Sequence, residues 1–305
     1  MEKKSANTLI CVCGPTAVGK TAMAIAIAQH FRCEIISFDS RQFYRELSIG
    51  TAVPSANELA AAKHHFIHDR SIKNSVNAGS FEKEALAKLE ELFTQNPIAV
   101  AVGGTGLYLR ALLEGIDDLP PIPGEIRRAI LADYERDGLS ILQDEVARLD
   151  PQYWLKVDQK NPQRLIRALE LLRHSGKTMD TLQKAEKKLR PFKALKIGLN
   201  IERPDLYEGI NKRVDVMFAA GLVEEVKSLQ EYRHQNALQT VGYSELFSHF
   251  DGDLSLEEAR NEIKKNSRRY AKRQLTWFRR DPEITWFSPQ QEMAILEFLN
   301  SSLDA

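Results

Sequence analysis

The sequence predicts an α/β fold with a parallel sheet, into which a helical domain is inserted. Two observations predict the sheet. Short apolar runs of the length of buried strands recur along the chain, and segments with helical periodicity separate them, as in βαβ units. A third observation predicts the insertion. After a proline-rich stretch at 119–124, only charged helical segments follow, up to about residue 188.

The first part of the chain supplies three expected strands and two expected helices. Residues 8–13 (TLICVC) form a β-rich apolar run that suits a strand buried on both faces. Residues 33–38 (CEIISF) and 98–102 (IAVAV) have the same character. Between these runs, residues 21–31 are rich in Ala and Ile and predict a buried helix, while residues 81–92 carry charges at helical spacing. Strands and helices therefore alternate.

The later part of the chain returns to the sheet and is otherwise helical. Residues 194–201 (ALKIGLNI) predict a returning strand, and residues 205–280 are again helical in pattern. We therefore expect an α/β core formed by residues 1–119 and 193–305, with residues 120–192 as the helical insertion.

Composition and charge exclude several classes of protein. The 305 residues include 42 Lys and Arg against 42 Asp and Glu, so the net charge is zero. This excludes a nucleic-acid-binding protein that is strongly basic overall, but it does not exclude a local basic patch. Three cysteines cannot form a disulfide framework and fit a reducing compartment. No apolar run approaches the roughly 20 residues of a membrane span, and residues 9–13 lead into a glycine motif rather than a signal-peptide cleavage site. We expect a cytoplasmic protein with no membrane association.

A complete P-loop motif, G-x-x-x-x-G-K-[ST], lies between the first expected strand and the first expected helix. Its glycines let the backbone curl so that successive N–H groups point at one anion, and the helix N-terminus adds its dipole. Lys20 supplies a full charge, and the Thr21 hydroxyl can ligate Mg²⁺. A glycine turn that binds nothing is the alternative. The residues expected to bind a diphosphate or nucleotide are Gly14, Pro15, Thr16, Ala17, Val18, Gly19, Lys20 and Thr21.

Two features at the expected carboxyl edge of the sheet bear on which reaction the P-loop serves. Asp39 follows the second strand, where it can hold Mg²⁺, act as a general base or simply cap a helix. Residues 102–108 (VGGTGLY) place glycines where an ordinary P-loop ATPase often has its magnesium aspartate, which disfavours a plain ATPase. The glycines allow a ligand or a second backbone segment to approach closely, and Thr105 offers a hydroxyl there. The alternative is that this segment is only a strand-to-helix turn.

The stretch 260–280 (RNEIKKNSRRYAKRQLTWFRR) is strongly basic. It holds nine Lys or Arg and one acid, a net charge of +8, with aromatic residues interleaved. On a helix, Arg269, Arg273 and Trp277 fall on one face at spacings of four. Such a face can follow a phosphate backbone and stack on unpaired bases. The alternative is a solvated basic face packed on an acidic neighbour.

Seven segments together carry a resemblance to a known family. In chain order they are GPTAVGKT at 14–21, SFDSRQFYRELSIGTA at 37–52, VGGTGLYLRALLEG at 102–115, NPQRLIRALE at 161–170, AAGLVEEV at 219–226, TVGYSEL at 240–246 and KRQLTWFRR at 272–280. The chain resembles the tRNA dimethylallyltransferases, the bacterial tRNA isopentenyltransferase family, over nearly its whole length.

The resemblance implies a P-loop NTPase-like core, Mg²⁺ dependence and prenyl transfer. The dimethylallyl group of dimethylallyl diphosphate moves to N6 of the adenine 3′-adjacent to the anticodon of a tRNA, forming N6-isopentenyladenosine and releasing pyrophosphate. Asp39 is then the base that takes the N6 proton, Thr16 and Thr105 position substrate oxygens, and Thr21 holds Mg²⁺. A monomer that binds the anticodon stem-loop is expected. The implied tRNA contacts are Asp39, Ser40, Arg41, Gln42, Thr105, Arg127, Gln163, Arg164, Arg167, Lys272, Arg273, Gln274, Trp277, Arg279 and Arg280.

Three other functions stay open at this point. A prenyltransferase acting on free adenylate would not need the basic stretch or the insertion to grip tRNA. A P-loop small-molecule kinase would transfer the γ-phosphate of ATP, which the glycines after the third strand disfavour. A non-catalytic RNA-binding NTPase module would hydrolyse ATP without leaving a product on tRNA.

Overall fold

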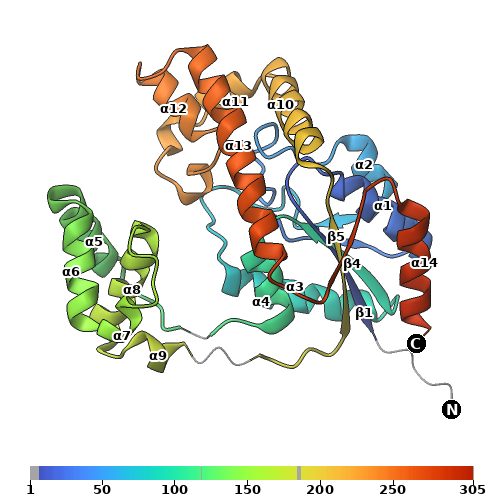
Figure 1. The fold of residues 1–305 in the computed structure, drawn as a ribbon, viewed down its shortest axis with the longest axis horizontal. Helices are drawn as coiled ribbons and strands as arrows, with labels where there is room; N and C mark the ends of the chain where they lie inside the picture. The colour runs from blue at the N-terminus through green and yellow to red at the C-terminus, as the bar shows by residue number, and fades with distance from the viewer. Residues whose placement is uncertain (1–6, 118, 184–186, 305) are drawn as a thin grey trace. The chain divides into compact units, whose positions relative to one another are not determined.

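The computed structural model describes residues 7–117, 119–183 and 187–304 (Figure 1). The chain divides into two compact units, which we call the core unit (Met1–Glu114 with Leu189–Ala305) and the insertion unit (Gly115–Lys188). The sequence analysis had placed the insertion at residues 120–192.

A six-stranded, all-parallel sheet forms the centre of the core unit, in the order β3-β2-β4-β1-β5-β6 (Figure 1). Its strands are β1 (Thr8–Cys13), β2 (Ile35–Ser37), β3 (His64–His65), β4 (Ile98–Gly103), β5 (Lys193–Leu199) and β6 (Ile284–Phe287). β1 lies in the middle and pairs with both β4 and β5, so every residue of β1 is buried. The predicted parallel α/β fold is confirmed, because the apolar runs are strands covered on both faces.

The sequence analysis missed the two edge strands. β3 is only two residues long and consists of half-buried histidines, so it lacks the apolar run that marks a buried strand. β6 has four residues of which only Ile284 is fully buried. Short edge strands of this kind are formed by tertiary pairing, and their own sequence gives little signal.

The helices of the core unit pack around the sheet and beyond its carboxyl edge (Figure 1). The 23-residue α13 begins at a capping box, in which the side chains of Ser255 and Glu258 each accept a hydrogen bond from the other residue's backbone N–H. Within the described residues, no helix is long and apolar enough to cross a membrane. The helices are α1 (Lys20–Phe31), α2 (Ala56–Ala61), α3 (Ala78–Phe93), α4 (Gly106–Glu114), α10 (Arg203–Ala219), α11 (Leu222–Lys227), α12 (Ser244–Phe250), α13 (Leu256–Phe278) and α14 (Glu292–Leu303).

The insertion unit has a hydrophobic core of its own, built from helices alone in its described part. Ile130, Leu142, Val146, Leu165 and Leu169 are fully buried in this cluster. A unit with a separate core can hold its shape independently of the sheet. Its helices are α5 (Gly124–Asp137), α6 (Leu139–Leu149), α7 (Pro151–Trp154), α8 (Pro162–Ser175) and α9 (Met179–Leu182).

Candidate active site

Two adjoining cavities open at the carboxyl edge of the sheet. The P-loop cavity, of about 1130 Å³, is lined by residues from the P-loop, the end of β2, the glycines after β4 and α10. The α10–α13 cavity, of about 740 Å³, lies between those two helices and the loops around residues 39–51 and 240–242. Both cavities share the residues Thr16, Asp39, Thr51, Arg213 and Tyr270.

Lys20 opens helix α1 at the P-loop and folds back over it. Its ammonium donates a 2.6 Å hydrogen bond to the carbonyl of Pro15. The pKa of Lys20 is lowered to about 8, first because burial disfavours the charged form and then because Arg213 is a like charge nearby. Thr21 lines the same cavity in the first turn of α1. The predicted polyphosphate site therefore has its cation and its hydroxyl together, and a second cation, Arg213, lines the same cavity.

Diphosphate binding should weaken as the pH rises above about 8. Below the pKa of Lys20 its ammonium attracts the diphosphate; above it the neutral amine does not, so the affinity falls by up to about tenfold per pH unit. Calorimetric titration with inorganic pyrophosphate from about pH 7 to about pH 10 measures this dependence. In Lys20→Arg, whose guanidinium keeps its proton, the step near pH 8 should disappear. The same step in both proteins would show that another group titrates.

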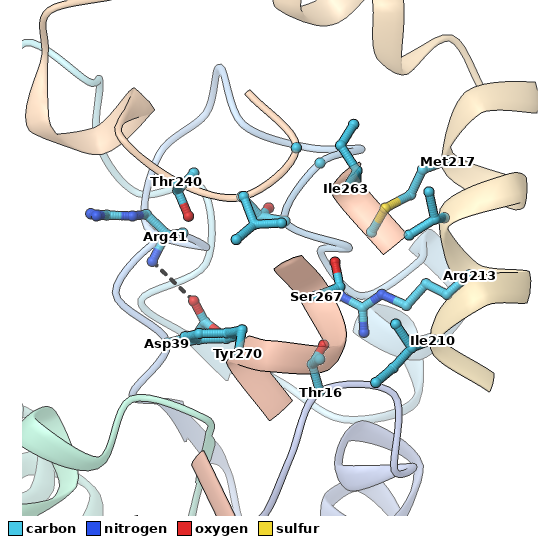
Figure 2. A pocket seen from close by; sticks show the side chains of 15 residues that line it. Thr16, Asp39, Arg41, Ile210, Arg213, Met217, Thr240, Ile263, Ser267 and Tyr270 are labelled. Carbon is cyan, nitrogen blue, oxygen red and sulfur yellow. Dashed lines mark hydrogen bonds between the residues drawn. The ribbon is translucent and has the colours of Figure 1, made fainter. Parts of the chain in front are cut away.

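Asp39 lies two residues after the end of β2 and lines both cavities (Figure 2). Its Oδ1 accepts a 2.9 Å hydrogen bond from the backbone N–H of Arg41, which fixes the carboxylate in a turn. The next residues form turns and not an α-helix, so the helix-cap interpretation of Asp39 is wrong. The carboxylate keeps further lone pairs for a proton or a cation.

Arg213, on α10, was not identified from the sequence, although it lines both cavities together with Thr16 and Asp39 and points into the pocket from the side opposite Asp39 (Figure 2). Burial lowers the pKa of its guanidinium and the charge of Asp39 partly offsets this. Among the described residues it has no ion-pair partner within 4 Å. A signal was present: Ile210 and Val214 are the buried face of α10, and Arg213 interrupts that face. A cation on an apolar helix face indicates a function more often than it indicates packing.

The glycines after β4 are explained by side chains of α13 that lie directly against them. A Cβ at Gly104 would stand 2.2 Å from Nε2 of Gln274, and one at Gly106 would stand 2.1 Å from the indole of Trp277. The predicted close approach therefore occurs, and the approaching groups include α13 side chains. α4 begins at Gly106, so the same glycines also form a strand-to-helix turn.

Gln274 joins the P-loop to this glycine turn. Its Oε1 accepts a 2.8 Å hydrogen bond from the N–H of Thr16, and its Nε2 donates a 2.9 Å bond to the carbonyl of Gly104. The side chain is buried, with 6% exposure. The structure therefore gives Gln274 a role in joining two loops, and its predicted contact with tRNA stays a prediction.

Replacing Gln274 with leucine should lower the free energy of unfolding by about 1–3 kcal/mol, because the N–H of Thr16 and the carbonyl of Gly104 lose their partner in a buried site. Urea denaturation measures the change. Arg273→Ala, at the exposed neighbouring position, is the control and should stay within about 0.5 kcal/mol of the wild type. A Gln274→Leu protein of unchanged stability that bound tRNA poorly would contradict the structural role and favour the predicted contact with tRNA.

Other predicted site residues in this region tie the loops to one another. The Thr105 hydroxyl accepts a bond from the N–H of Ser40 (3.1 Å) and donates one to its hydroxyl (3.2 Å). The side-chain amide of Gln42 donates to the carbonyls of Thr51 and Ala52. These contacts bring the loops after β2 and β4 together at the cavities.

A carboxylate from α11 holds the loop at 48–50, which forms one wall of the α10–α13 cavity. Glu225 accepts hydrogen bonds from the N–H groups of Ser48, Ile49 and Gly50 at 2.8–3.0 Å. The hydroxyl of Tyr243 donates to the same carboxylate at 2.6 Å, and this raises the pKa of Tyr243 together with burial, the larger cause. Four donors on one carboxylate make this wall rigid.

The basic helix α13 has a neutralised part and an unpaired part. Arg260 and Lys264 both pair with Asp215, at 2.9 and 2.7 Å. Lys265 pairs with Glu262. Further along, five exposed cations form no ion pair with any described residue: Arg269, Lys272, Arg273, Arg279 and Arg280. The surface charge that is free to meet an anion is therefore concentrated toward the C-terminal end of the helix. Trp277 is 36% exposed beside it.

In the insertion unit, a buried carboxylate gathers two of the predicted arginines. Glu170 accepts from Arg127 at 2.6 Å and from Arg167 at 2.9 Å, while both arginines remain nearly half exposed. Gln163 and Arg164 lie exposed on the first turn of α8. All four residues thus belong to one small helical unit.

Comparison with known proteins gives a consistent result. The IPP transferase family model matches residues 42–281. The chain is 51% identical over 299 residues to the tRNA dimethylallyltransferase of Christiangramia forsetii, covering 98% of this chain and 99% of that protein. It is 49% identical to the tRNA dimethylallyltransferase of Flavobacterium johnsoniae, covering 92% of each.

Solved structures agree with these relatives. The full-length tRNA isopentenylpyrophosphate transferase from Bacillus halodurans is similar with a TM-score of 0.73 and 34% identity, covering 98% of this chain and 97% of that one. A eukaryotic dimethylallyltransferase acting on tRNA gives a TM-score of 0.70 and 26% identity, covering 89% of this chain and 69% of that one.

Proposed function

The chain belongs to the IPP transferase family, and from that premise we propose the reaction that it catalyses. It is a prenyl-transferring enzyme that modifies tRNA. The donor is dimethylallyl diphosphate and the acceptor is N6 of the adenine 3′-adjacent to the anticodon. The products are N6-isopentenyladenosine in the tRNA and pyrophosphate. The observation that supports this most is the junction of the two cavities, where Thr16, Asp39 and Arg213 face a shared space.

The leaving group belongs in the P-loop cavity. As the bond between the allylic carbon and the diphosphate oxygen breaks, negative charge grows on the diphosphate while the carbon becomes positive. Lys20, Arg213 and the backbone N–H groups of the P-loop can stabilise that growing charge. Burial lowers the pKa of both cations more than the charge of Asp39 raises it, so a diphosphate bound between them would stabilise their charged forms.

Mg²⁺ fits the oxygen donors of the P-loop cavity. The hydroxyls of Thr21 and Ser37 and the carboxylate of Asp39 line it together. Magnesium is usually held by one or two such protein oxygens plus substrate phosphates, so no larger cluster of carboxylates is needed. When bound, the ion would neutralise charge on the diphosphate.

Asp39 takes the proton that the adenine N6 must lose when it forms the new bond to carbon. The amine is a weak nucleophile because its lone pair is delocalised into the ring, so a base in reach speeds the step. Tyr270 lies beside Asp39 at the cavity junction, and its pKa is raised to about 12, mainly by burial. Its phenol therefore stays protonated and can donate to the substrate. An adenine in an anticodon loop leaves its stack more easily than one in a duplex.

The tRNA is held by cations that protein carboxylates do not neutralise. The unpaired end of α13, Lys272 to Arg280, suits a phosphate backbone. We propose that Arg164 and Gln163, which are exposed on α8, also contact the tRNA, together with Arg127 and Arg167, whose side chains are nearly half exposed although both pair with Glu170. The enzyme acts in the cytoplasm as a monomer, where its tRNA substrates are.

Incubation of the protein with radiolabelled dimethylallyl diphosphate, Mg²⁺ and unmodified tRNA tests the proposal. Label should enter the tRNA, and mass spectrometry of the nucleosides should find N6-isopentenyladenosine. No incorporation by folded protein would refute it. Two further assays test the alternatives. If AMP competes with tRNA as the acceptor, the protein is a free-adenylate prenyltransferase. Transfer or release of the γ-phosphate of labelled ATP would identify a kinase or an NTPase module.

A further inference from the structure

We propose that the apolar end of the α10–α13 cavity holds the five-carbon tail of the donor, and that Met217 and Ile263 limit the length of tail that the enzyme accepts. This inference rests on the proposed function, which makes the donor an isoprenoid diphosphate. It adds the residues that would distinguish a five-carbon donor from a longer one.

One end of this cavity is aliphatic. Ile210, Val214 and Met217 follow one another at spacings of four and three on α10 and therefore share a face of that helix. Ile263 of α13 faces the same space. Figure 2 shows Met217 and Ile263 on the side of the cavity away from Asp39 and Arg41. Ile210, Val214 and Ile263 are at most 2% exposed, so they form a packed wall.

Two of the charged residues of the cavity, Asp39 and Arg213, lie where it meets the P-loop cavity. Asp39 and Arg213 belong to both cavities, whereas Met217 and Ile263 line only the α10–α13 cavity. Arg213 comes between Ile210 and Val214 in sequence, so the guanidinium and the aliphatic wall are adjacent on α10. A molecule with a diphosphate at Lys20 and Arg213 and a short branched hydrocarbon next to it matches this order of charged and apolar surface.

The other substrate group fits the aliphatic end less well. Adenine carries ring nitrogens and an exocyclic amine, and aliphatic side chains leave those groups without hydrogen-bond partners. A dimethylallyl group has no polar atom to satisfy. The purine is better matched to the polar side of the α10–α13 cavity, where Asp39, Tyr270 and Arg41 offer polar and aromatic groups.

Length selection follows from the packing of this end. Ile263 is 1% exposed and cannot move aside without disturbing its neighbours, and packed interiors resist added volume. Met217 is only partly buried, so its side chain lies between the cavity and the surface of α10. Shortening either side chain should open room for a longer tail. Shortening Met217 should be tolerated by the fold, because this residue is not part of the buried core.

A competition between two donors tests the inference. Equal concentrations of dimethylallyl diphosphate and geranyl diphosphate are offered with tRNA, and mass spectrometry quantifies the C5 and C10 nucleosides. Their ratio equals the ratio of the two kcat/KM values and does not depend on how much of a variant is folded. Met217→Ala and Ile263→Ala should each raise the C10-to-C5 ratio at least ~10-fold. Val216→Ala, at a position 66% exposed on the same helix, should keep the wild-type ratio.

The possible results distinguish a failure of this inference from a failure of the proposed function. If the wild type transfers C5 and both variants keep its C10-to-C5 ratio, the length limit lies elsewhere and the inference is wrong, while the proposed function stands. A wild type that uses both donors equally well also overturns it. If the wild type transfers neither group to tRNA, the proposed function fails and the inference with it.

Discussion

Replacing Asp39 with alanine should lower turnover at least ~100-fold while tRNA binding stays close to the wild-type value. The carboxylate is the acidic group that both cavities share, and it lies at the point where the P-loop cavity opens into the α10–α13 cavity. Without it, the proton on N6 has no base in reach as the new bond to carbon forms. General-base catalysis typically contributes about 10²–10⁴-fold, which sets the size of the expected loss.

Asp39→Asn separates the proton-accepting role of Asp39 from its structural role. Asparagine can still accept the hydrogen bond from the N–H of Arg41, so the turn after β2 keeps its geometry. It should nevertheless lose turnover nearly as strongly as alanine does. Single-turnover assays with preformed enzyme–tRNA complex measure the rate, and filter binding measures the affinity. Near-normal turnover in Asp39→Asn would reject Asp39 as the base.

Replacing Arg213 with alanine should lower kcat/KM for dimethylallyl diphosphate by about 10²–10³-fold, the usual cost of removing a donor aimed at a developing negative charge. Its guanidinium faces both cavities and has no ion-pair partner within 4 Å among the described residues, so it is available to bind the diphosphate. The affinity for tRNA should be unchanged. Lys212→Ala, an exposed cation one position earlier, is the matched control and should behave as the wild type does.

Stability gives a second test of Arg213. Burial of a cation without a partner is unfavourable, so Arg213→Met should unfold at the same temperature as the wild type or a higher one. Product inhibition by pyrophosphate should weaken in the same variant. A protein that lost stability but kept its pyrophosphate inhibition would show that Arg213 supports the fold and does not bind the leaving group.

The parts of the site that could be predicted are those encoded by neighbouring residues. The P-loop is one contiguous motif, and the strands before it and before the glycine turn are long apolar runs, so both were found. Asp39 was found because it directly follows a strand that ends at the ligand-binding edge of a parallel sheet.

The parts that escaped prediction depend on contacts between distant segments. Gln274 was assigned to tRNA because it lies among exposed cations, but its partner Thr16 is 258 residues away. Arg213 lies in a helix that contains no motif. Its position at the P-loop cavity depends on how α10 packs in the folded chain, which the sequence does not reveal. The strand β3 is two residues long and gains its pairing from β2.

The carboxylate of Glu225 has a consequence for synthesis of the chain. The amides that it gathers precede it by 175–177 residues, and a nascent chain leaves the ribosome N-terminus first. The P-loop and the loop at 48–50 are therefore synthesised long before α11, the helix whose Glu225 holds the second of these loops. Until α11 has emerged, the loop at 48–50 has no carboxylate to hold its N–H groups, so this wall of the α10–α13 cavity can form only late in synthesis.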